Sequence, residues 1–586
     1  LYPVEGYAVG KAPREALEKA YSHDLFYQEA VNETFPAALV EAIASEDIQI
    51  AAPPALNVET IGPDGYTFTA LIDLYPEVKL GQYKGLSAPW ENVELSDDDT
   101  NEAIQRFLTE HLVEQEQDRA AMGDEVTLDF DGSVDGVPFD GGKAENYPLL
   151  LGSGIYFTIR TGFVQVRKFG EGMRLVFGNI SLKGKEAGKD GMSSFQALAT
   201  AIAAQVGTGN IAGCASALVS GGPGAVFWMW VSAFFGMATI YGEAVLAQKY
   251  KEVSEDGAVS GGPIYFIKAA FKGKLGTFMA GFFAVAIILA LGFMGNMVQS
   301  NSIGDAFYTA FGVPKIAAGI VVAAVSAFIF LGGVKRIAAI TEKLVPIMAI
   351  FYICGALIAI GMNAQNILPA LQSIFVGAFT PQAVMGGAIG ISIKEAVRFG
   401  VARGLFSNEA GMGSTPHAHA MAKVEKPQDQ GAVAMVGVFI DTFIVLTLTA
   451  LVILTSGMLG TTGADGQMLT ATALAQAAFN NSFGSFGNAF VAICLLFFAF
   501  STIVGWYFFG ESNVNALFKG SKKATFLYGV IALVFIVVGS FQKVTLVWDM
   551  SDMFNGLMVI PNLLAVLALS GIVAKFAKDD TYLGKE

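Results

Sequence analysis

The chain has 586 residues, of which 53% are hydrophobic and only 15% are charged, and its formal net charge is −15 at pH 7. This composition excludes an ordinary soluble protein and a disordered one, and it is typical of a membrane protein. The charge is divided unevenly, since residues 1–150 carry 8 Lys and Arg against 30 Asp and Glu, whereas residues 151–586 carry 28 against 21. We therefore expect an acidic, soluble α+β front, a membrane body with basic loops, and no nucleic-acid partner.

The three cysteines, Cys214, Cys354 and Cys494, all fall within apolar runs. Free cysteine behaves as a small apolar residue, so this placement predicts core positions rather than a disulfide or a metal site. The chain begins at Leu1, without Met and without a signal sequence, and we expect further residues to precede it in the complete protein.

Alternating patterns in the acidic front predict a small α+β fold. Residues 11–48 carry apolar side chains at helical spacing. Ser96, which three Asp residues follow, caps a polar helix that reaches about Arg119. The expected strands are Tyr66–Leu74, Glu125–Asp131 and Val134–Phe139, the last two on either side of a turn at Gly132.

The first residues contain a motif that a known chaperone family shares. Gly6–Arg14 has the sequence Gly-Tyr-Ala-Val-Gly-Lys-Ala-Pro-Arg, which resembles the ribosome-docking loop of the bacterial trigger factor family. The resemblance implies a partial ribosome-binding segment over residues 1–90 and a helical linker over residues 91–121. Because Ala8 and Val9 stand where the family has a basic pair, we do not expect docking on the ribosome.

Residues 122–150 resemble the start of the FKBP-type prolyl isomerase domain of the same family. The matching motifs are Asp129–Gly132 and Phe139–Lys143, in which Phe139 and Asp140 correspond to pocket positions. The remainder of that domain does not follow, because the chain becomes membrane-like at about residue 150. A piece of roughly 30 residues cannot close a hydrophobic core of its own, so we expect no isomerase activity.

Residues 151–586 form the predicted membrane body. Upstream of it, Tyr147–Ile159 is shorter than the roughly 20 apolar residues that a membrane helix needs. We therefore expect that the chaperone-like front is fused to the membrane body and that this fusion removed most of one peripheral helix. Ten longer apolar segments follow, at about 193–218, 223–248, 277–300, 314–333, 344–361, 381–404, 430–457, 486–509, 524–541 and 545–575.

Lys and Arg are concentrated in every second loop, which predicts the orientation. The basic groups lie in residues 160–192 and 249–276, at Lys335, Arg336 and Lys343, at Lys519, Lys522 and Lys523, and at Lys575, Lys578 and Lys585. The intervening loops carry only Lys315 and Lys543. We therefore expect a cytoplasmic C-terminus and a first segment that runs from inside to outside. If Tyr147–Ile159 does not span, the acidic front is cytoplasmic as well.

Two of the ten segments contain glycine-rich interruptions. The first segment contains Val206–Gly213 (VGTGNIAG), and the sixth leads into Arg403–Ser414 (RGLFSNEAGMGS). Broken helices at membrane depth are tolerated only where they line a cavity or are buried in protein. Because the two interruptions lie five segments apart, the two halves have opposite topology, and such a pair predicts a transporter site.

These motifs, together with others along the body, resemble the alanine/glycine:cation symporter family, whose members have a leucine-transporter-like fold. The further matching motifs are Ser194–Leu198, Gly221–Trp230, Phe439–Thr442 and Ser501–Trp506. The resemblance implies an all-α polytopic membrane protein with a 5+5 inverted-repeat core of ten helices. It also implies sodium-coupled uptake of alanine, glycine or a similar small amino acid.

The first interruption divides into two kinds of polar backbone group. Free N–H groups at Gly207–Asn210 suit a carboxylate, aided by the half-helix dipole, and the resemblance assigns the substrate carboxylate to Thr208 and Gly209. Unpaired carbonyls at about Ala203–Val206 suit a hard cation. The plainer alternative is close helix packing by small residues.

Three further segments supply candidate side chains. Phe293, Asn296 and Ser300 share one helix face, where Asn296 could bind the substrate or simply a neighbouring helix. By resemblance, Ser501 and Thr502 are Na⁺ ligands. Trp506 would close a small pocket, although Trp is also common as an interfacial anchor. The second interruption adds Phe406, Ser407 and Asn408 to the expected substrate site.

Buried ionisable groups are functional candidates in membrane proteins. We expect Glu243 and Glu511 to be solvated or paired with Lys near the cytoplasmic ends, and Asp441 to be buried and hydrogen-bonded. For Glu409 we expect a pair with Arg403. We expect His417 and His419 to be solvated rather than metal ligands.

The sequence therefore predicts a multi-pass transporter of the cell membrane, with Na⁺ or H⁺ as coupling ion and alternating access about the two interruptions. It does not choose between alanine and glycine. Two alternatives stay open: a membrane-tethered chaperone or prolyl isomerase, and a chimera whose membrane body does not work.

Overall fold

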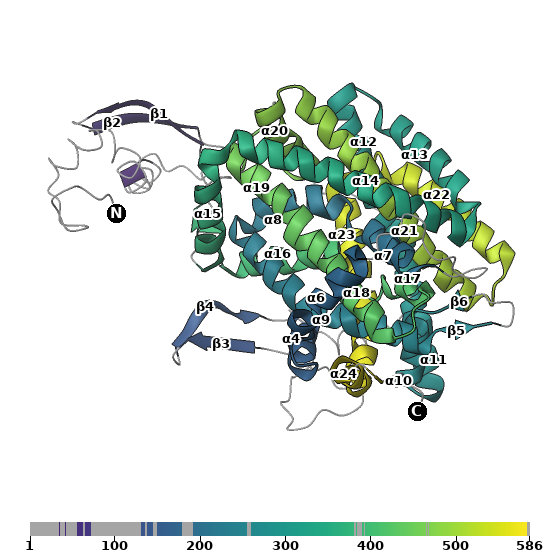
Figure 1. Cartoon of the computed structure of the whole chain (residues 1–586). Helices are drawn as coiled ribbons and strands as arrows, with labels where there is room; N and C mark the ends of the chain where they lie inside the picture. The colour runs from purple at the N-terminus through teal and green to yellow at the C-terminus, as the bar shows by residue number, and fades with distance from the viewer. Residues whose placement is uncertain are drawn as a thin grey trace, which may run out of the picture. The chain divides into compact units, whose positions relative to one another are not determined.

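The computed structural model describes most of the membrane body and parts of the front (Figure 1). The described residues are 34–35, 42, 55–62, 65–71, 130–134, 137–144, 149–178, 192–254, 259–379, 382–383, 390–391, 393–463, 466, 468–579 and 581–582. They belong to two units, Leu1–Arg119 and Ala120–Glu586.

The first unit contains one described β-hairpin. Strand β2 (Gly65–Leu71) pairs antiparallel with β1 (Ala55–Gly62), and the register shifts between Val58 and Thr60. The strand predicted at Tyr66–Leu74 is therefore confirmed over most of its length, whereas its partner was not predicted. The predicted helix from Ser96 lies outside the described residues, as does nearly all of residues 11–48.

The second unit begins with a hairpin of β3 (Phe130–Val134) and β4 (Val137–Ala144). The two strands meet between Val134 and Val137, so the turn predicted at Gly132 is wrong. Gly132 lies inside β3, and the pairing passes through an irregularity between Asp131 and Ser133.

The membrane body is a bundle of helices. Its elements are α4 (Leu149–Arg160), α5 (Val164–Arg167), α6 (Phe169–Phe177), α7 (Ser194–Gln205), η2 (Gly209–Gly213), α8 (Cys214–Gly221), α9 (Gly224–Tyr250), β5 (Glu252–Val253), β6 (Val259–Ser260), α10 (Pro263–Ala270), α11 (Gly273–Ile287), η3 (Ile288–Gly295), α12 (Asn296–Phe311), α13 (Lys315–Phe330), α14 (Gly333–Met362), η4 (Ala364–Asn366), α15 (Ile367–Phe379), β7 (Gln382–Ala383), β8 (Gly390–Ile391), α16 (Ile393–Asn408), α17 (Pro416–Met421), α18 (Pro427–Val438), η5 (Phe439–Leu446), α19 (Thr447–Ser456), α20 (Ala471–Phe483), α21 (Phe486–Leu517), α22 (Lys522–Gly539), α23 (Val544–Ala568) and α24 (Ser570–Lys578).

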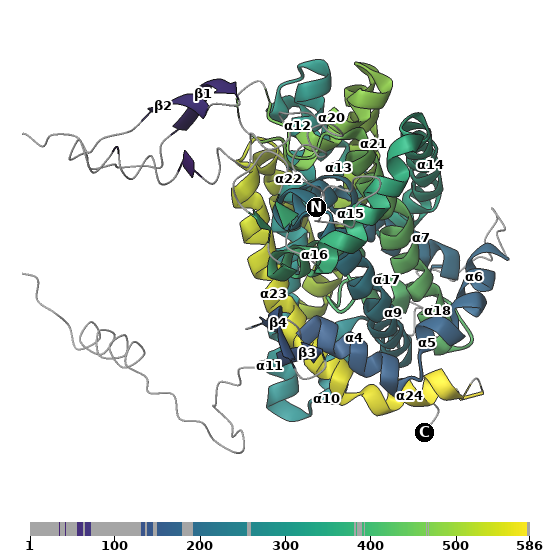
Figure 2. The same ribbon diagram turned by 90° about the vertical axis from the view of Figure 1, so that its left-hand side faces the viewer.

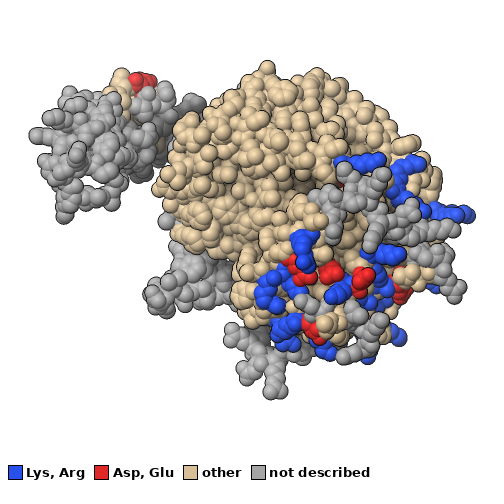
Figure 3. Space-filling view, viewed as in Figure 1, with Lys and Arg blue, Asp and Glu red and all other residues tan. Residues whose placement is uncertain are grey.

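Within the described residues, 7 helices are long and apolar enough to cross a membrane, and the bent pair α7–α8 raises the number to 8. The shorter apolar helix α13 and the helix α16 occupy the other two predicted segments. The polytopic all-α class is therefore confirmed. Figure 3 agrees, since a broad part of the visible surface of the body carries no charged side chain.

Several predicted boundaries are wrong. The sixth segment was expected at residues 381–404, but α16 begins at Ile393 and continues to Asn408. The last segment, expected at 545–575, is divided into α23 and α24. Helices α15 and α20 lie in stretches that were predicted to be loops, because neither has the length of a membrane span.

Helix α4 replaces the incomplete segment predicted at Tyr147–Ile159. It has 12 residues, packs on α9, and lies with α24 at one end of the bundle, far from α12 and α20 (Figures 1 and 2). The hydroxyl groups of Tyr156 and Ser570 lie 3.0 Å apart and link the two helices.

Small residues bring the helices of the bundle into close contact. A Cβ atom at Gly400 would lie 2.5 Å from the carbonyl oxygen of Ala225 and 2.7 Å from the Cβ of Trp228, so α16 packs backbone to backbone on α9. Membrane helices associate through such contacts, because lipid tails remove any hydrophobic driving force between them. The contact fixes α16, and with it the second interruption, against the bundle.

We expect Gly400→Ala to destabilise the folded body by about 1–3 kcal/mol, because the carbonyl oxygen of Ala225 belongs to the backbone and cannot move aside easily. The measurement is the thermal unfolding midpoint of the purified protein in detergent. Gly281→Ala in α11 is the matched control, since its Cβ would meet nothing within 4 Å. Equal midpoints for the two variants would contradict this packing argument.

Candidate functional site

The first membrane helix is interrupted where the glycine pattern predicted. Helix α7 ends at Gln205, Val206 takes an extended conformation, and the axis bends by 46° before the chain continues through η2 into α8. At Gly207 a Cβ atom would collide with the hydroxyl of Thr502 and lie 3.1 Å from Oε1 of Gln299. Glycine is therefore required here by the close approach of a neighbouring helix.

Two amide groups of this interruption are bound by side-chain oxygens. The N–H of Gly207 donates to Oδ1 of Asn210 at 2.9 Å, and the N–H of Thr208 donates to Oε1 of Gln299 at 3.1 Å. Both acceptors are neutral amide oxygens, so they occupy positions that a substrate carboxylate oxygen could take. Gln299 was not among the predicted site residues, although it lies three residues after Asn296 on the same helix.

The carbonyl groups before the interruption meet two hydroxyl groups of α21. The hydroxyl oxygen of Thr502 lies 2.9 Å from the carbonyl oxygen of Ala203, 3.4 Å from that of Val206 and 3.0 Å from that of Phe498 in its own helix. The hydroxyl of Ser501 lies 3.3 Å from the carbonyl of Ala203. All four residues are buried. The structure thus brings the predicted cation ligands together.

This oxygen set fits a hard monovalent cation. Carbonyl and hydroxyl oxygens are neutral, and both keep a lone pair that can turn toward a cation. No group of three or more His, Cys, Asp or Glu that could hold a metal occurs within the described residues. One peptide group joins the two halves of the site, because the carbonyl of Val206 faces Thr502 while the N–H of Gly207 faces Asn210.

The second interruption begins later than predicted. Residues 404–408 belong to α16, and the chain leaves the helix at Glu409, which has a left-handed φ of 58°. Gly411 and Gly413 follow with φ of 87° and 78°, conformations that favour glycine, and α17 starts at Pro416. The interrupted stretch is therefore Glu409–Thr415 rather than the whole of the predicted motif.

The two interruptions touch each other. A Cβ atom at Gly209 would lie 3.1 Å from the Cα of Ser407 and 3.3 Å from the ring of Phe406. The side-chain amide of Gln205, at the end of α7, donates to the carbonyl of Asn408 at 2.7 Å. These contacts place Phe406, Ser407 and Asn408, three of the predicted substrate-site residues, beside the first interruption.

Asp441 bridges the two interrupted helices. Its Oδ1 accepts hydrogen bonds from Nδ2 of Asn210 at 2.6 Å and from the hydroxyl of Ser407 at 2.9 Å, while its Oδ2 accepts from Thr442. The residue is fully buried, so the prediction of a buried and hydrogen-bonded carboxyl group is confirmed. Its position in the π-helical turn η5 aims it at both interruptions.

Glu243 holds the second interruption from the opposite side. The prediction of a solvated or Lys-paired group is wrong, because the residue is fully buried. Its carboxyl oxygens accept from the N–H groups of Gly411 at 2.9 Å and Gly413 at 3.0 Å, and from Nδ2 of Asn562 in α23 at 2.6 Å. Because unwound backbone needs hydrogen-bond partners inside a membrane, Glu243 and Asn562 replace the missing helical bonds. Glu511 is buried too, so its predicted solvation is also wrong.

Glu409 contacts the indole that was expected to close the pocket. Its carboxyl group accepts from the indole N–H of Trp506 and from the hydroxyl of Ser414. Arg403 instead pairs with Asp552 at 2.9 Å, so the predicted pair between Arg403 and Glu409 is wrong. The polar bond to Glu409 fixes the plane of the indole ring.

Aromatic rings surround the meeting point of the two interruptions. The ring of Trp506 meets that of Phe406 edge to face at 5.8 Å, and Phe406 lies 4.7 Å from the ring of Trp548. A Cβ atom at Gly295 would collide with Trp506. The wall is therefore apolar and tightly packed.

The predicted face of the third segment lies only partly at this wall. Asn296 is fully buried, donates to the carbonyl of Gly292 at 2.9 Å, and leaves Oδ1 without a partner in the described structure. The hydroxyl of Ser300 binds the carbonyl of Met297 in its own helix at 3.1 Å. The ring of Phe293 stacks on Phe535 of α22 at 5.0 Å, and the structure does not bring it to either interruption.

Both histidines of α17 are buried, so their predicted solvation is wrong. An amide nitrogen can only donate and a carbonyl can only accept. Nε2 of His417 therefore accepts from Asn513 at 2.8 Å, and its Nδ1 donates to the carbonyl of Ser414 at 2.7 Å. His419 accepts from the side-chain amide of Gln430 in the same way.

Just beyond the end of α9, Lys251 donates to the carbonyl of Ala422 at 2.8 Å. Burial lowers the pKa of Lys251 to about 8, because the charged ammonium group is partly removed from water. The contact ties the chain after α17 to α9.

Two family models match the chain. Residues 145–585 match the sodium:alanine symporter family, and residues 2–107 match the bacterial trigger factor protein. The chain is 43% identical over 431 residues to the sodium/alanine symporter AgcS of Methanococcus maripaludis, an alignment that covers 73% of this chain and 92% of that protein. It is 41% identical over 450 residues to the amino-acid carrier protein AlsT of Bacillus subtilis, with 77% and 92% covered.

Among solved structures, that of MhsT in complex with L-phenylalanine aligns with a TM-score of 0.48 at 14% identity, over 67% of this chain and 98% of that one. The resemblance of the front to trigger factor is confirmed by the match over residues 2–107. The match of the body identifies a multi-pass membrane transporter rather than an enzyme, with Na⁺ as its coupling ion. On this match and these relatives, the chain belongs to the sodium:alanine symporter family.

Proposed function

We propose that the chain carries alanine or glycine into the cell together with Na⁺, by alternating access about the two interrupted helices. The observation that carries this proposal is the juxtaposition at the first interruption. The hydroxyls of Ser501 and Thr502 lie within hydrogen-bond distance of carbonyl oxygens at Ala203 and Val206. The N–H groups that follow, those of Gly207 and Thr208, face side-chain oxygens.

In this proposal Na⁺ binds the carbonyls of Ala203 and Val206 and the hydroxyls of Ser501 and Thr502. The carbonyl of Val206 and the N–H of Gly207 belong to one peptide group. A cation bound to the carbonyl oxygen polarises this group and makes its N–H a stronger hydrogen-bond donor. A carboxylate at the N–H groups of Gly207, Thr208 and Gly209 is stabilised in turn by the positive end of the following half-helix.

The substrate carboxylate replaces Oε1 of Gln299 on the N–H of Thr208, and the freed Gln299 side chain becomes available to the ligand. The ammonium group of the substrate lies at the carboxyl end of the other interrupted helix, α16. Ser407 and Phe406, in the last turn of α16, lie beside Gly209, and the carbonyl end of that helix carries the negative end of its dipole. Asn210 and Asn296 are then positioned to add side-chain hydrogen bonds.

A small side chain is favoured by the apolar wall. Phe406, Trp506 and Trp548 pack edge to face or tilted, and Trp506 is held in place by Glu409. Because a packed aromatic wall resists displacement, a methyl group or a hydrogen fits where a branched side chain would clash. Alanine and glycine satisfy this condition.

The proposed sidedness follows from the basic loops, which place the C-terminus and the acidic front in the cytoplasm. A tethered chaperone is not favoured, because the family match covers the whole membrane body, with relatives above 40% identity. We do not expect the front to bind a ribosome, since Ala8 and Val9 replace a basic pair.

In proteoliposomes, an inward Na⁺ gradient should drive uptake of labelled alanine and glycine, with little uptake of leucine, because the wall admits only a small side chain. Replacement of Na⁺ by choline at constant pH should abolish uptake. Equal uptake in choline, or faster uptake of leucine than of alanine, would contradict the proposed cycle.

Removing one hydroxyl of the proposed cation site should weaken the binding of Na⁺. We expect Ser501→Ala to raise the Na⁺ concentration for half-maximal alanine uptake about tenfold, the effect of one hydrogen bond to a charged group. Ser512→Ala is the matched control, because within the described part of the chain its hydroxyl binds the carbonyl of Phe508 in the same helix, at 2.9 Å, and no other group. If both variants keep the wild-type Na⁺ dependence, Ser501 is not a ligand.

The carboxylate site should respond to a single methyl group. Gly209→Ala places a Cβ 3.1 Å from Ser407, and we expect the alanine concentration for half-maximal uptake to rise about tenfold at saturating Na⁺. Gly213→Ala, in the same π-helical turn, meets its nearest neighbour at 3.6 Å and should transport normally. Normal alanine affinity in Gly209→Ala would argue against this site.

A further inference from the structure

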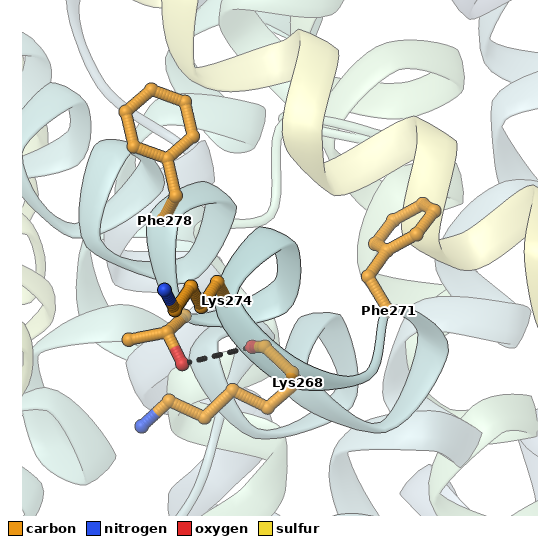
Figure 4. Close-up of a pocket in the computed structure, with 6 residues that line it drawn as sticks. Lys268, Phe271, Lys274 and Phe278 are labelled. Carbon is orange, nitrogen blue, oxygen red and sulfur yellow. Dashed lines mark hydrogen bonds between the residues drawn. The ribbon is translucent and has the colours of Figure 1, made fainter.

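A hollow of about 680 Å³ lies at the corner between α10 and α11. It is lined by Lys268, Phe271, Gly273, Lys274, Thr277 and Phe278. Figure 4 shows Lys268 and Phe271 from the end of α10 and the turn after it, with Lys274 and Phe278 from the first turns of α11, around the same space. The dashed line there is the bond from the hydroxyl of Thr277 to the carbonyl of Gly273, 3.1 Å long.

The hollow is positively charged and without a counter-ion in the described structure. Lys268 and Lys274 are both exposed, and neither forms a salt bridge with a described residue. Lys272 adds a third ammonium group in the turn between them. No Asp or Glu occurs in the sequence from Gly261 to Asn301. Figure 3 shows Lys and Arg, with several Asp and Glu among them, gathered over the part of the body where α10, α11 and α24 lie.

One face of α11 continues from the hollow as an exposed apolar strip. Leu275, Phe278, Phe282 and Val285 are 51%, 69%, 41% and 49% exposed and recur at helical spacing. The rings of Phe278 and Phe282 stack at 6.4 Å. Since α11 is part of a membrane-crossing helix of 39 residues, this strip faces lipid acyl chains.

We propose that this corner binds an acidic phospholipid of the surrounding bilayer. Its phosphate lies between the ammonium groups of Lys268 and Lys274, and its acyl chains lie along Phe278 and Phe282. Basic pockets at the ends of membrane helices recognise anionic head groups through this combination of charge and adjoining apolar surface. A zwitterionic lipid carries no net charge and gains less from the two lysines.

The test uses the full-length protein in detergent, titrated with phosphatidylglycerol or with phosphatidylcholine and followed by native mass spectrometry. The wild type should bind phosphatidylglycerol more tightly than phosphatidylcholine. In the double variant Lys268→Gln/Lys274→Gln we expect phosphatidylglycerol affinity to fall about tenfold, because each lysine near an anionic lipid surface contributes an appreciable attraction. Affinity for phosphatidylcholine should not change.

Lys522→Gln/Lys523→Gln, an exposed basic pair at the start of α22 that does not line the hollow, is the control and should bind as the wild type does. Lys268→Arg/Lys274→Arg keeps the charge and should retain binding. Unchanged phosphatidylglycerol affinity in the Gln variant would overturn the proposal, as would an equal loss in the control pair. Displacement of the lipid by millimolar glycerol phosphate would show that the acyl chains do not contribute, and would also overturn it. None of these readouts depends on amino acid transport.

Discussion

Unwound backbone at the depth of a membrane must find hydrogen-bond partners within the protein, and the rest of this structure depends on meeting that requirement. The first interruption is satisfied by Asn210, Gln299 and the hydroxyl of Thr502. The second is satisfied by Glu243, which binds the N–H groups of Gly411 and Gly413. Asn210 belongs to the first interruption itself, whereas Gln299, Thr502 and Glu243 come from α12, α21 and α9, so the bonds that keep the interruptions open also hold three neighbouring helices against them.

In the proposed function, the same constraint connects the cation site to the substrate site. The peptide group between Val206 and Gly207 presents its oxygen to the hydroxyl of Thr502 and its nitrogen to Asn210. Two ligands of opposite charge on the two ends of one peptide group stabilise each other, and by linkage each raises the affinity of the other. Asp441 extends this connection to the second interruption, because Asn210 and Ser407 bind the same carboxyl oxygen. In the proposed cycle, occupation of the first interruption is therefore transmitted to α16, which carries the second interruption.

The sequence predicted the elements whose signal is local. The length of the apolar segments located most of the membrane helices, and the glycines of Val206–Gly213 located the first interruption, because both signals come from residues that are consecutive in the sequence. What the sequence did not predict depends on neighbours distant along the chain. Glu243 was expected near solvent, but it binds the backbone of Gly411 and Gly413, which lie about 170 residues later in the sequence. Likewise Arg403 lies close to Glu409 in sequence, yet its partner is Asp552.

We propose that Na⁺ at the carbonyls of Ala203 and Val206 prepares the neighbouring N–H groups for the substrate carboxylate. Calorimetric titration of the purified full-length protein with alanine, in sodium chloride and in choline chloride of equal ionic strength, tests it most directly. We predict that alanine binds in sodium chloride and that its affinity falls at least about tenfold in choline chloride, a coupling of typical allosteric size. Equal affinities in the two salts would contradict the account.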